Sequence, residues 1–160
     1  MRIVTTLVAS LALLGSSALH AQLATKKTMT LEAARQIAAA AEAEARKNKW
    51  NVVIAIVDDG ANLVYLQKMD ETQIGSIEVA QEKARTAVKF KRASKVFEDA
   101  VKGGRQVVLK LPGALPIEGG LPLMIDGKMV GAIGVSGVQS NEDGIIAAAG
   151  VETFNRMAAR

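Results

Sequence analysis

The first periodic segment of the chain, residues 31–47, predicts an amphipathic helix. Its apolar residues recur every three or four positions, which gathers them on one face of a helix. The residues on that face are Leu31, Ala34, Ile37, Ala38, Ala41 and Ala45. Thr30 is a favourable N-cap, and the basic pair Arg46 and Lys47 complements the negative end of the helix dipole. The small alanine side chains would allow this helix to pack closely on a sheet.

A continuous apolar run, Val52 to Val57, predicts a strand buried on both faces because most of its residues are β-branched. Residues 58–62 carry the aspartate, glycine and asparagine that are typical of a turn. Residues 63–66 then resume a strand pattern, so the two strands are expected to form a hairpin.

Two helices are predicted in the middle of the chain. Ser76 is expected to cap the first, whose apolar residues share one helical face as far as Val88. The second is short, from about Ser94 to Val101, and the glycine pair 103–104 follows its end as a helix terminator.

Three further strands are predicted after the second of these helices. Residues 106–111 read as one strand on their apolar and β-branched content. The turn Asp126-Gly127 predicts a hairpin between strands at 121–125 and 129–136.

A final helix is expected from the capping-box pattern Ser140-x-x-Asp143 through Met157. The predicted order is therefore helix, two strands, two helices, three strands and helix. This order predicts an α/β (α+β) domain, with a central five-stranded antiparallel sheet and helices packed on it.

Residues 1–21 have the organisation of a secretory signal peptide. Arg2 precedes an apolar stretch from Val4 to Leu14, and small residues then lead to a cleavage position after Ala21. This stretch is shorter than the ~20 residues that a spanning helix needs, so stable membrane insertion is not expected. The protein is predicted to be periplasmic or secreted. Its expected parts are a signal peptide at 1–21, a lead-in at 22–29 and one domain at 30–158.

The amino-acid composition of the chain excludes several kinds of catalytic and metal-binding site. The chain of 160 residues has no cysteine, and its single histidine, His20, lies within the predicted signal peptide. The mature protein would therefore lack disulfides, thiolate metal sites, histidine general bases and a Ser-His-Asp triad. The formal net charge of +4 comes without a clustered basic run, which argues against a nucleic-acid partner.

Three glycines recur at regular spacing: Gly131 and Gly134 lie in the predicted strand at 129–136, and Gly137 follows it directly. Their spacing differs from the dinucleotide fingerprint, and Gly127-Lys128 lacks the spacing of a phosphate-binding loop, so no nucleotide cofactor is expected. Glycines inside a strand indicate a bulge, a close approach by another backbone, or contact with a flat ligand. The sequence favours the first two interpretations and leaves the third open.

Glu78 and Glu82 lie one turn apart on a predicted helix, with Arg85 three residues further on. Two carboxylates in this arrangement are candidate ligands for a hard metal cation. The alternative is a solvated face on which Arg85 pairs with Glu82. Exposed pairs at this spacing are common, so the second interpretation is favoured.

The string LPIEGGLPL at 115–123 and the strings IDGK and VGAIGVSG that follow it resemble the GlcG/HbpS family of haem-binding proteins. This family is related to the C-terminal domain of PduO-type proteins. The similarity extends over roughly Met29 to Phe154, and the weaker motifs occur in the order expected of the family. Those motifs are Val57-Asp58-Asp59-Gly60, Leu63-Val64, Met69-Asp70, Lys83-Ala84-Arg85-Thr86-Ala87, Glu142-Asp143 and Ala149-Gly150.

The resemblance implies a profilin-like fold, assembly into a homo-oligomer, and binding of haem or a related tetrapyrrole in at least some members. The ligand site is expected where missing Cβ atoms would let a flat anionic molecule approach the backbone. The glycines placed at this site are Gly119, Gly120, Gly131, Gly134 and Gly137.

Four side chains complete the predicted haem site. Lys83 and Arg85 lie in a helix motif that matches the family, and they are the candidate partners of the propionates. Met69 and Tyr65 are the candidate axial ligands of the iron, because the mature chain has neither histidine nor cysteine.

The leading functional prediction is an exported protein that binds haem or a similar flat anion, in haem or iron handling or sensing. The alternative is an enzyme or accessory protein acting on a small organic acid, whose carboxylate Lys83 and Arg85 would hold. A third option is a purely structural oligomeric module. Catalysis is less favoured, because the mature chain has no histidine or cysteine and leaves carboxylates, Lys83 and Tyr65 as the acid–base candidates.

Overall fold

The order of helices and strands was established from a computed structural model, which describes residues 23–159. The predicted signal peptide lies outside these residues. The elements are α1 (Leu31–Lys47), β1 (Val53–Asp58), β2 (Leu63–Lys68), α2 (Ser76–Phe90), α3 (Lys95–Lys102), the 3₁₀ helix η1 (Gln106–Lys110), β3 (Gly120–Ile125), β4 (Lys128–Ser136) and α4 (Ser140–Ala158). Within the described part of the chain, no helix is long and apolar enough to cross a membrane.

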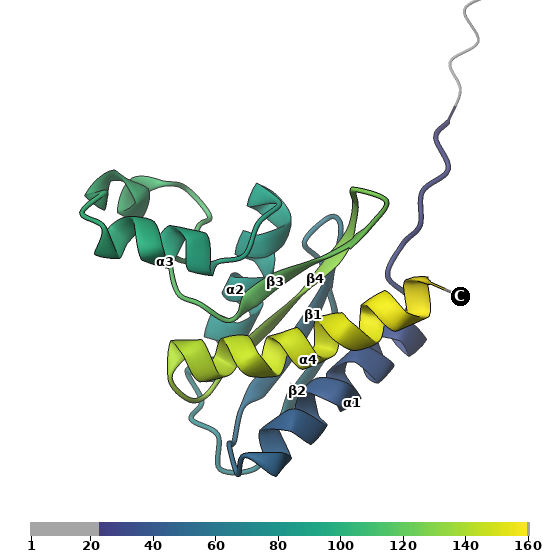
Figure 1. Cartoon of the computed structure of the whole chain (residues 1–160), viewed down its shortest axis with the longest axis horizontal. Helices are drawn as coiled ribbons and strands as arrows, with labels where there is room; N and C mark the ends of the chain where they lie inside the picture. The colour runs from purple at the N-terminus through teal and green to yellow at the C-terminus, as the bar shows by residue number, and fades with distance from the viewer. Residues whose placement is uncertain (1–22, 160) are drawn as a thin grey trace, which may run out of the picture.

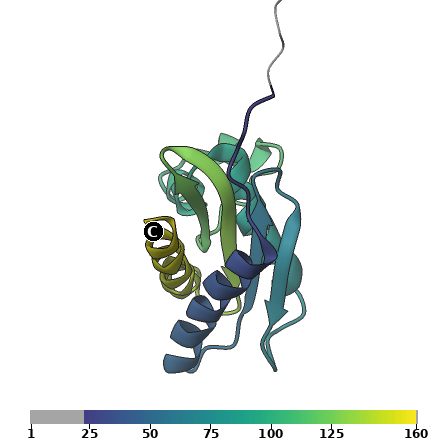
Figure 2. The same ribbon diagram turned by 90° about the vertical axis from the view of Figure 1, so that its right-hand side faces the viewer.

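The four strands form one antiparallel sheet in the order β2-β1-β4-β3. Helices α1 and α4 lie side by side and cross one face of this sheet, whereas α2 covers the other face (Figure 1). The view turned by 90° shows the strands between α4 and α2 (Figure 2). The fold is therefore α+β, as predicted, but the sheet has four strands and not five.

The missing fifth strand is the segment predicted at 106–111, which forms η1 instead. Only Val108 of this segment is buried, whereas Val107 and Leu109 on either side are largely exposed. One inward residue among outward neighbours suits a short 3₁₀ turn better than a strand. The β-branched residues gave a strand propensity, but such propensity depends on pairing with a neighbouring strand, and this segment pairs with none of the four strands of the sheet.

Strand β1 is buried on both faces, which confirms its prediction from the apolar run. Its larger side chains Ile54 and Ile56 belong to the main core, which includes residues of α1 and α4. The side chains on the opposite face, including Ala55, pack against α2. The hairpin with β2 is also confirmed.

Two of the three predicted helix caps are displaced by one residue. Thr30 caps α1 as predicted, and its hydroxyl accepts the Ala33 N–H at 3.2 Å. Ser76 is instead the first residue of α2, after Gly75, and its hydroxyl contacts that of Ser136 at 3.2 Å. The capping box of α4 uses Gln139 and Glu142 rather than Ser140 and Asp143. This shift leaves Asp143 available for an interior contact.

The glycines of β3 and β4 allow close packing within the protein. A Cβ atom on Gly134 would lie 2.0 Å from the Ala80 carbonyl oxygen, and one on Gly120 would lie 2.1 Å from the Lys83 carbonyl oxygen. Similar clashes, at 2.3 Å, would arise between Gly131 and the Val57 oxygen and between Gly137 and the Asn51 oxygen. The space that was expected to admit a flat ligand is therefore occupied by backbone.

Substitution of Gly134 by alanine tests this close approach. The added Cβ must displace the backbone of α2, so we expect Gly134→Ala to lose roughly 3 kcal/mol of unfolding free energy, at the upper end of overpacking effects. Urea denaturation measures the loss. The matched control is Gly75→Ala, because a Cβ there meets no atom within 4 Å. Equal losses in the two variants would contradict close packing as the reason for Gly134.

Candidate functional site

Lys83, a predicted ligand-binding residue, is buried in an ion pair with Asp143. Its side chain is 1% exposed, and its Nζ lies 2.7 Å from Oδ2 of Asp143. The same ammonium donates to the Val135 carbonyl at 3.0 Å. Lys83 is therefore bonded within the protein and does not face a solvent-accessible ligand site.

The surroundings of Asp143 are built to accommodate this pair. Burial raises the pKa of the Asp143 carboxyl, although the Lys83 ammonium and the Val138 N–H oppose that shift. Gly119 lies directly against the pair and has φ +122°, a conformation that favours glycine. A Cβ on Gly119 would come within 2.9 Å of both Lys83 Nζ and Asp143 Cβ. The missing side chain at Gly119 thus makes room for the ion pair rather than for a ligand.

The loop before β3, residues 112–119, is held at three points by buried side chains. The Thr86 hydroxyl of α2 accepts the Leu115 N–H at 2.8 Å. The Ser94 hydroxyl accepts the Gly120 N–H at 2.9 Å, where the loop enters β3. Glu98 of α3 accepts the Glu118 N–H at 2.5 Å. The string that carries most of the family resemblance is therefore fixed by contacts inside the fold.

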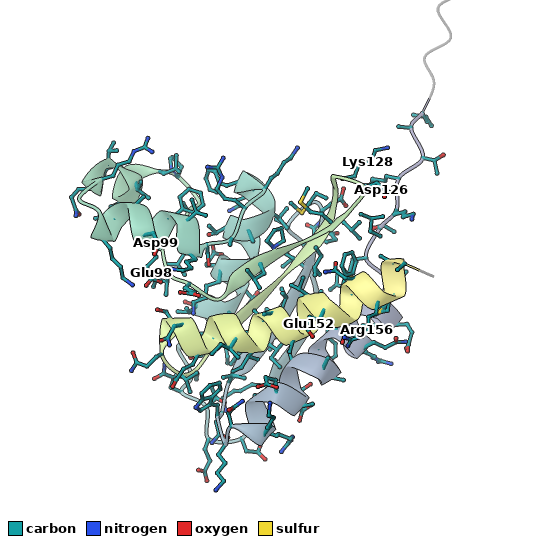
Figure 3. The ribbon with its side chains drawn as sticks, in the orientation of Figure 1. Glu98, Asp99, Asp126, Lys128, Glu152 and Arg156 are labelled. Carbon is teal, nitrogen blue, oxygen red and sulfur yellow. The ribbon has the colours of Figure 1, made fainter. Side chains whose placement is uncertain are left out.

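Glu98 joins three parts of the structure at once. Besides the Glu118 N–H, its carboxylate accepts hydrogen bonds from the Lys102 ammonium and, at 3.2 Å, from the Ser140 hydroxyl at the start of α4. Burial alone would raise the pKa of the Glu98 carboxyl, but these hydrogen bonds outweigh the burial and lower the pKa below its ordinary value. Figure 3 labels Glu98 and its neighbour Asp99 on α3.

Arg85, the second predicted carboxylate partner, is also engaged within the protein. Its guanidinium forms an ion pair with Glu82 at 2.7 Å and donates weakly to the Ala61 carbonyl at 3.4 Å. This is the pairing that the sequence favoured over a metal site at Glu78 and Glu82. Among residues 23–159, no group of three or more histidine, cysteine or acidic side chains is placed to hold a metal ion.

The two candidate axial ligands lie on or beside the edge strand β2. Met69 follows the strand and is buried in the main core. Tyr65 is half-buried, and its hydroxyl donates to Gln67 Oε1 at 3.1 Å.

A pocket of about 440 Å³, named here the α3–η1 pocket, lies at the corner formed by α3, η1 and the end of α2. Figure 1 shows this corner projecting away from the sheet. Phe90 and Phe97 meet edge to face in its wall, with ring centroids 5.0 Å apart. The full lining consists of Phe90, Arg92, Val96, Phe97, Ala100, Arg105, Val107, Val108, Lys110 and Leu111.

The α3–η1 pocket combines an apolar wall with positive charge. Three of its lining residues are cationic, Arg92, Arg105 and Lys110, and none of the described residues that line it is acidic. The Arg92 guanidinium lies 5.8 Å from the centroid of the Phe97 ring, a cation–π contact. Val107 in the wall is 65% exposed. This combination suits a flat apolar molecule that carries negative groups at one edge.

This pocket was not predicted from the sequence, because residues 106–111 were expected to form a strand of the sheet. The sequence nevertheless contains a signal for this pocket in the positions of its aromatic residues. The chain has three phenylalanines, and two of them, Phe90 and Phe97, are seven residues apart on either side of a predicted helix start. The cations Arg105 and Lys110 flank the apolar residues that follow.

Comparison with known proteins connects the chain to haem proteins. Residues 29–152 match the family described as haem degrading protein HbpS-like. Protein GlcG of Escherichia coli strain K12 is 41% identical over 112 residues, which cover 70% of this chain and 84% of GlcG.

Solved structures share the fold over most of the chain. The crystal structure of Klebsiella pneumoniae protein ORFY has a TM-score of 0.76 and 31% identity, covering 86% of this chain and 98% of ORFY. The crystal structure of the PduOC:haem complex has a TM-score of 0.73 and 27% identity, covering 80% of this chain and 96% of PduOC.

Removing one member of the buried ion pair should destabilise the protein. We expect Lys83→Met to lose about 3–5 kcal/mol of unfolding free energy, because it leaves the Asp143 carboxylate buried without its partner. The double variant Lys83→Met/Asp143→Leu should lose much less than the sum of the two single variants. The control Arg156→Ala breaks the exposed pair with Glu152 and should cost under about 1 kcal/mol. Wild-type stability of Lys83→Met in urea would refute this role.

The lowered pKa of Glu98 predicts a loss of stability in acid. A carboxylate whose pKa is lower in the folded state stabilises the protein above its unfolded pKa, and this contribution disappears as the pH falls through the folded pKa. We expect Glu98→Gln to cost roughly 1.5–3 kcal/mol at neutral pH, because charged hydrogen bonds are lost. The difference from wild type should be constant near neutral pH and should shrink as the pH falls below the unfolded pKa of glutamate, about 4.3.

Urea denaturation at a series of pH values measures this difference. The control Glu152→Gln removes a carboxylate that is 74% exposed on α4 (Figure 3) and shows the effect of losing a surface charge. A difference between Glu98→Gln and wild type that stays constant over the whole pH series would refute the assignment.

Proposed function

Because the chain belongs to the HbpS-like family of haem-degrading proteins, we propose that it binds haem or a closely related tetrapyrrole in the α3–η1 pocket. The observation that carries this proposal is the combination of an aromatic and aliphatic wall with three cations in one pocket. A related protein of the same fold, PduOC, has been crystallised as a haem complex.

The chemistry of the pocket fits the macrocycle and its carboxylates. Haem has two broad apolar faces and two propionate groups at one edge. The rings of Phe90 and Phe97 and the side chain of Val107 offer an apolar surface for one face of the macrocycle. Arg105 and Lys110 carry the N–H donors that bind carboxylates through charge-assisted hydrogen bonds.

The size of the pocket agrees with this role. Its volume of about 440 Å³ lies within the range of about 300–1,000 Å³ that is usual for small-molecule sites. The pocket is open to solvent on one side, as the exposure of Val96 and Val107 indicates. A flat ligand seated there would cover these apolar side chains and keep its carboxylates at the positively charged rim.

Export and self-assembly are part of the same proposal. The signal-peptide pattern of residues 1–21 supports a periplasmic or secreted protein that handles or senses haem outside the cytoplasm. The open edge of the sheet at β2, where Leu63 is 43% exposed, supports a homo-oligomer. The role in haem handling does not require catalysis by this chain.

Haemin titration followed by the Soret absorbance tests the proposed site. We expect Arg105→Ala/Lys110→Ala to raise the dissociation constant by about tenfold, because each lost charge contact contributes up to about 1 kcal/mol. Val107→Glu should weaken binding further, since it places a carboxylate in the apolar wall. The fold should tolerate this change because Val107 is exposed.

The matched control is Arg46→Ala/Lys128→Ala, which removes the same two kinds of charge from α1 and the β3–β4 hairpin. If all variants bind haemin as the wild type does, the α3–η1 pocket is not the site. If the wild type shows no saturable Soret change, haem is not a ligand of this protein.

A further inference from the structure

We infer that the α3–η1 pocket recognises the macrocycle and the carboxylates of its ligand but not the central metal, so that its substrate class includes metal-free porphyrins. This inference rests on the proposed tetrapyrrole function and makes it more specific. It follows from the donor groups that the pocket does and does not contain.

The pocket has no side chain suited to ligate haem iron. Proteins hold that iron through histidine, cysteine thiolate, methionine or tyrosine. None of the ten described residues that line the pocket is of these four types. The lining supplies aromatic rings, aliphatic groups, two guanidinium groups and one amine.

The cationic groups of the pocket do not replace a conventional ligand. Lys110 lies on the exposed side of η1. A lysine ammonium has three N–H donors and no lone pair. A guanidinium is likewise a donor only. These groups can bind the carboxylates of a tetrapyrrole, but they offer nothing to its metal.

The other side chains that could ligate iron are engaged in contacts outside the pocket. The hydroxyls of Thr86 and Ser94 are fully buried and accept backbone N–H groups that anchor the loop before β3. Met69 is in the main core, and the Tyr65 hydroxyl is bonded to Gln67. Strand β2, which carries Tyr65, is the sheet edge opposite β3. None of these four residues lines the pocket.

The free energy of binding must then come from two sources that are independent of the metal. One is apolar contact between the macrocycle and the wall around Phe90 and Phe97, and the other is pairing of the carboxylates with Arg105 and Lys110. A porphyrin without a metal retains both features. A porphyrin diester retains the first feature and loses the charge on the second.

The experiment compares three ligands on the wild-type protein: haemin, metal-free protoporphyrin IX and its dimethyl ester. Protoporphyrin fluorescence and Soret absorbance give the dissociation constants, and displacement of protoporphyrin by haemin shows whether the two share a site. We expect haemin and protoporphyrin IX to bind within about tenfold of each other, and the diester to bind at least about tenfold more weakly. Val107→Glu and Arg105→Ala/Lys110→Ala should weaken haemin and protoporphyrin IX by the same factor.

A second measurement examines the iron itself. The absorbance spectrum of the haem complex should be unchanged by Met69→Leu and by Tyr65→Phe, which remove the two other candidate ligands. A preference for haemin of more than about tenfold, or a spectral change in either variant, overturns the inference while leaving haem binding intact. If neither haemin nor protoporphyrin IX binds, the proposed function itself fails, and the inference fails with it.

Discussion

The buried ion pair between Lys83 and Asp143 connects α2 with α4, which lie on opposite faces of the sheet. Two charges out of water are stable only when each has its partner and its hydrogen bonds, so the surrounding chain is constrained by them. Gly119 is constrained because any side chain there would displace the pair. The start of α4 is constrained as well, because Asp143 faces inward and the capping role passes to Gln139 and Glu142.

The residues that stabilise the fold around this ion pair are different from the residues that line the proposed ligand pocket. The glycine-rich strings and the Lys83 motif serve contacts between backbone and buried side chains. The α3–η1 pocket instead exposes aromatic, aliphatic and cationic groups and uses none of those motifs. In this chain, the motifs that carry the family resemblance stabilise the fold and do not line the proposed ligand pocket.

Much of the fold could be predicted from periodicity, since α1, the buried strand β1 and both hairpins follow patterns that local physics determines. The 3₁₀ helix at 106–110 could not be, because its apolar residues gave a β propensity and nothing in the sequence showed that the segment would leave the edges of the sheet unpaired. The burial of Lys83 was equally hidden, since its partner Asp143 is 60 residues away. A lysine in a helix is usually solvated, and only the tertiary structure shows that this one is not.

The α3–η1 pocket has a further property that follows from its position in the chain. All ten lining residues fall between Phe90 and Leu111, so its shape is encoded in one contiguous stretch. The contacts within such a stretch are close in sequence and carry a low entropic cost of loop closure. Substitutions confined to these lining residues would therefore change the shape and charge of the proposed site without altering the Lys83–Asp143 pair or the glycine contacts of the sheet.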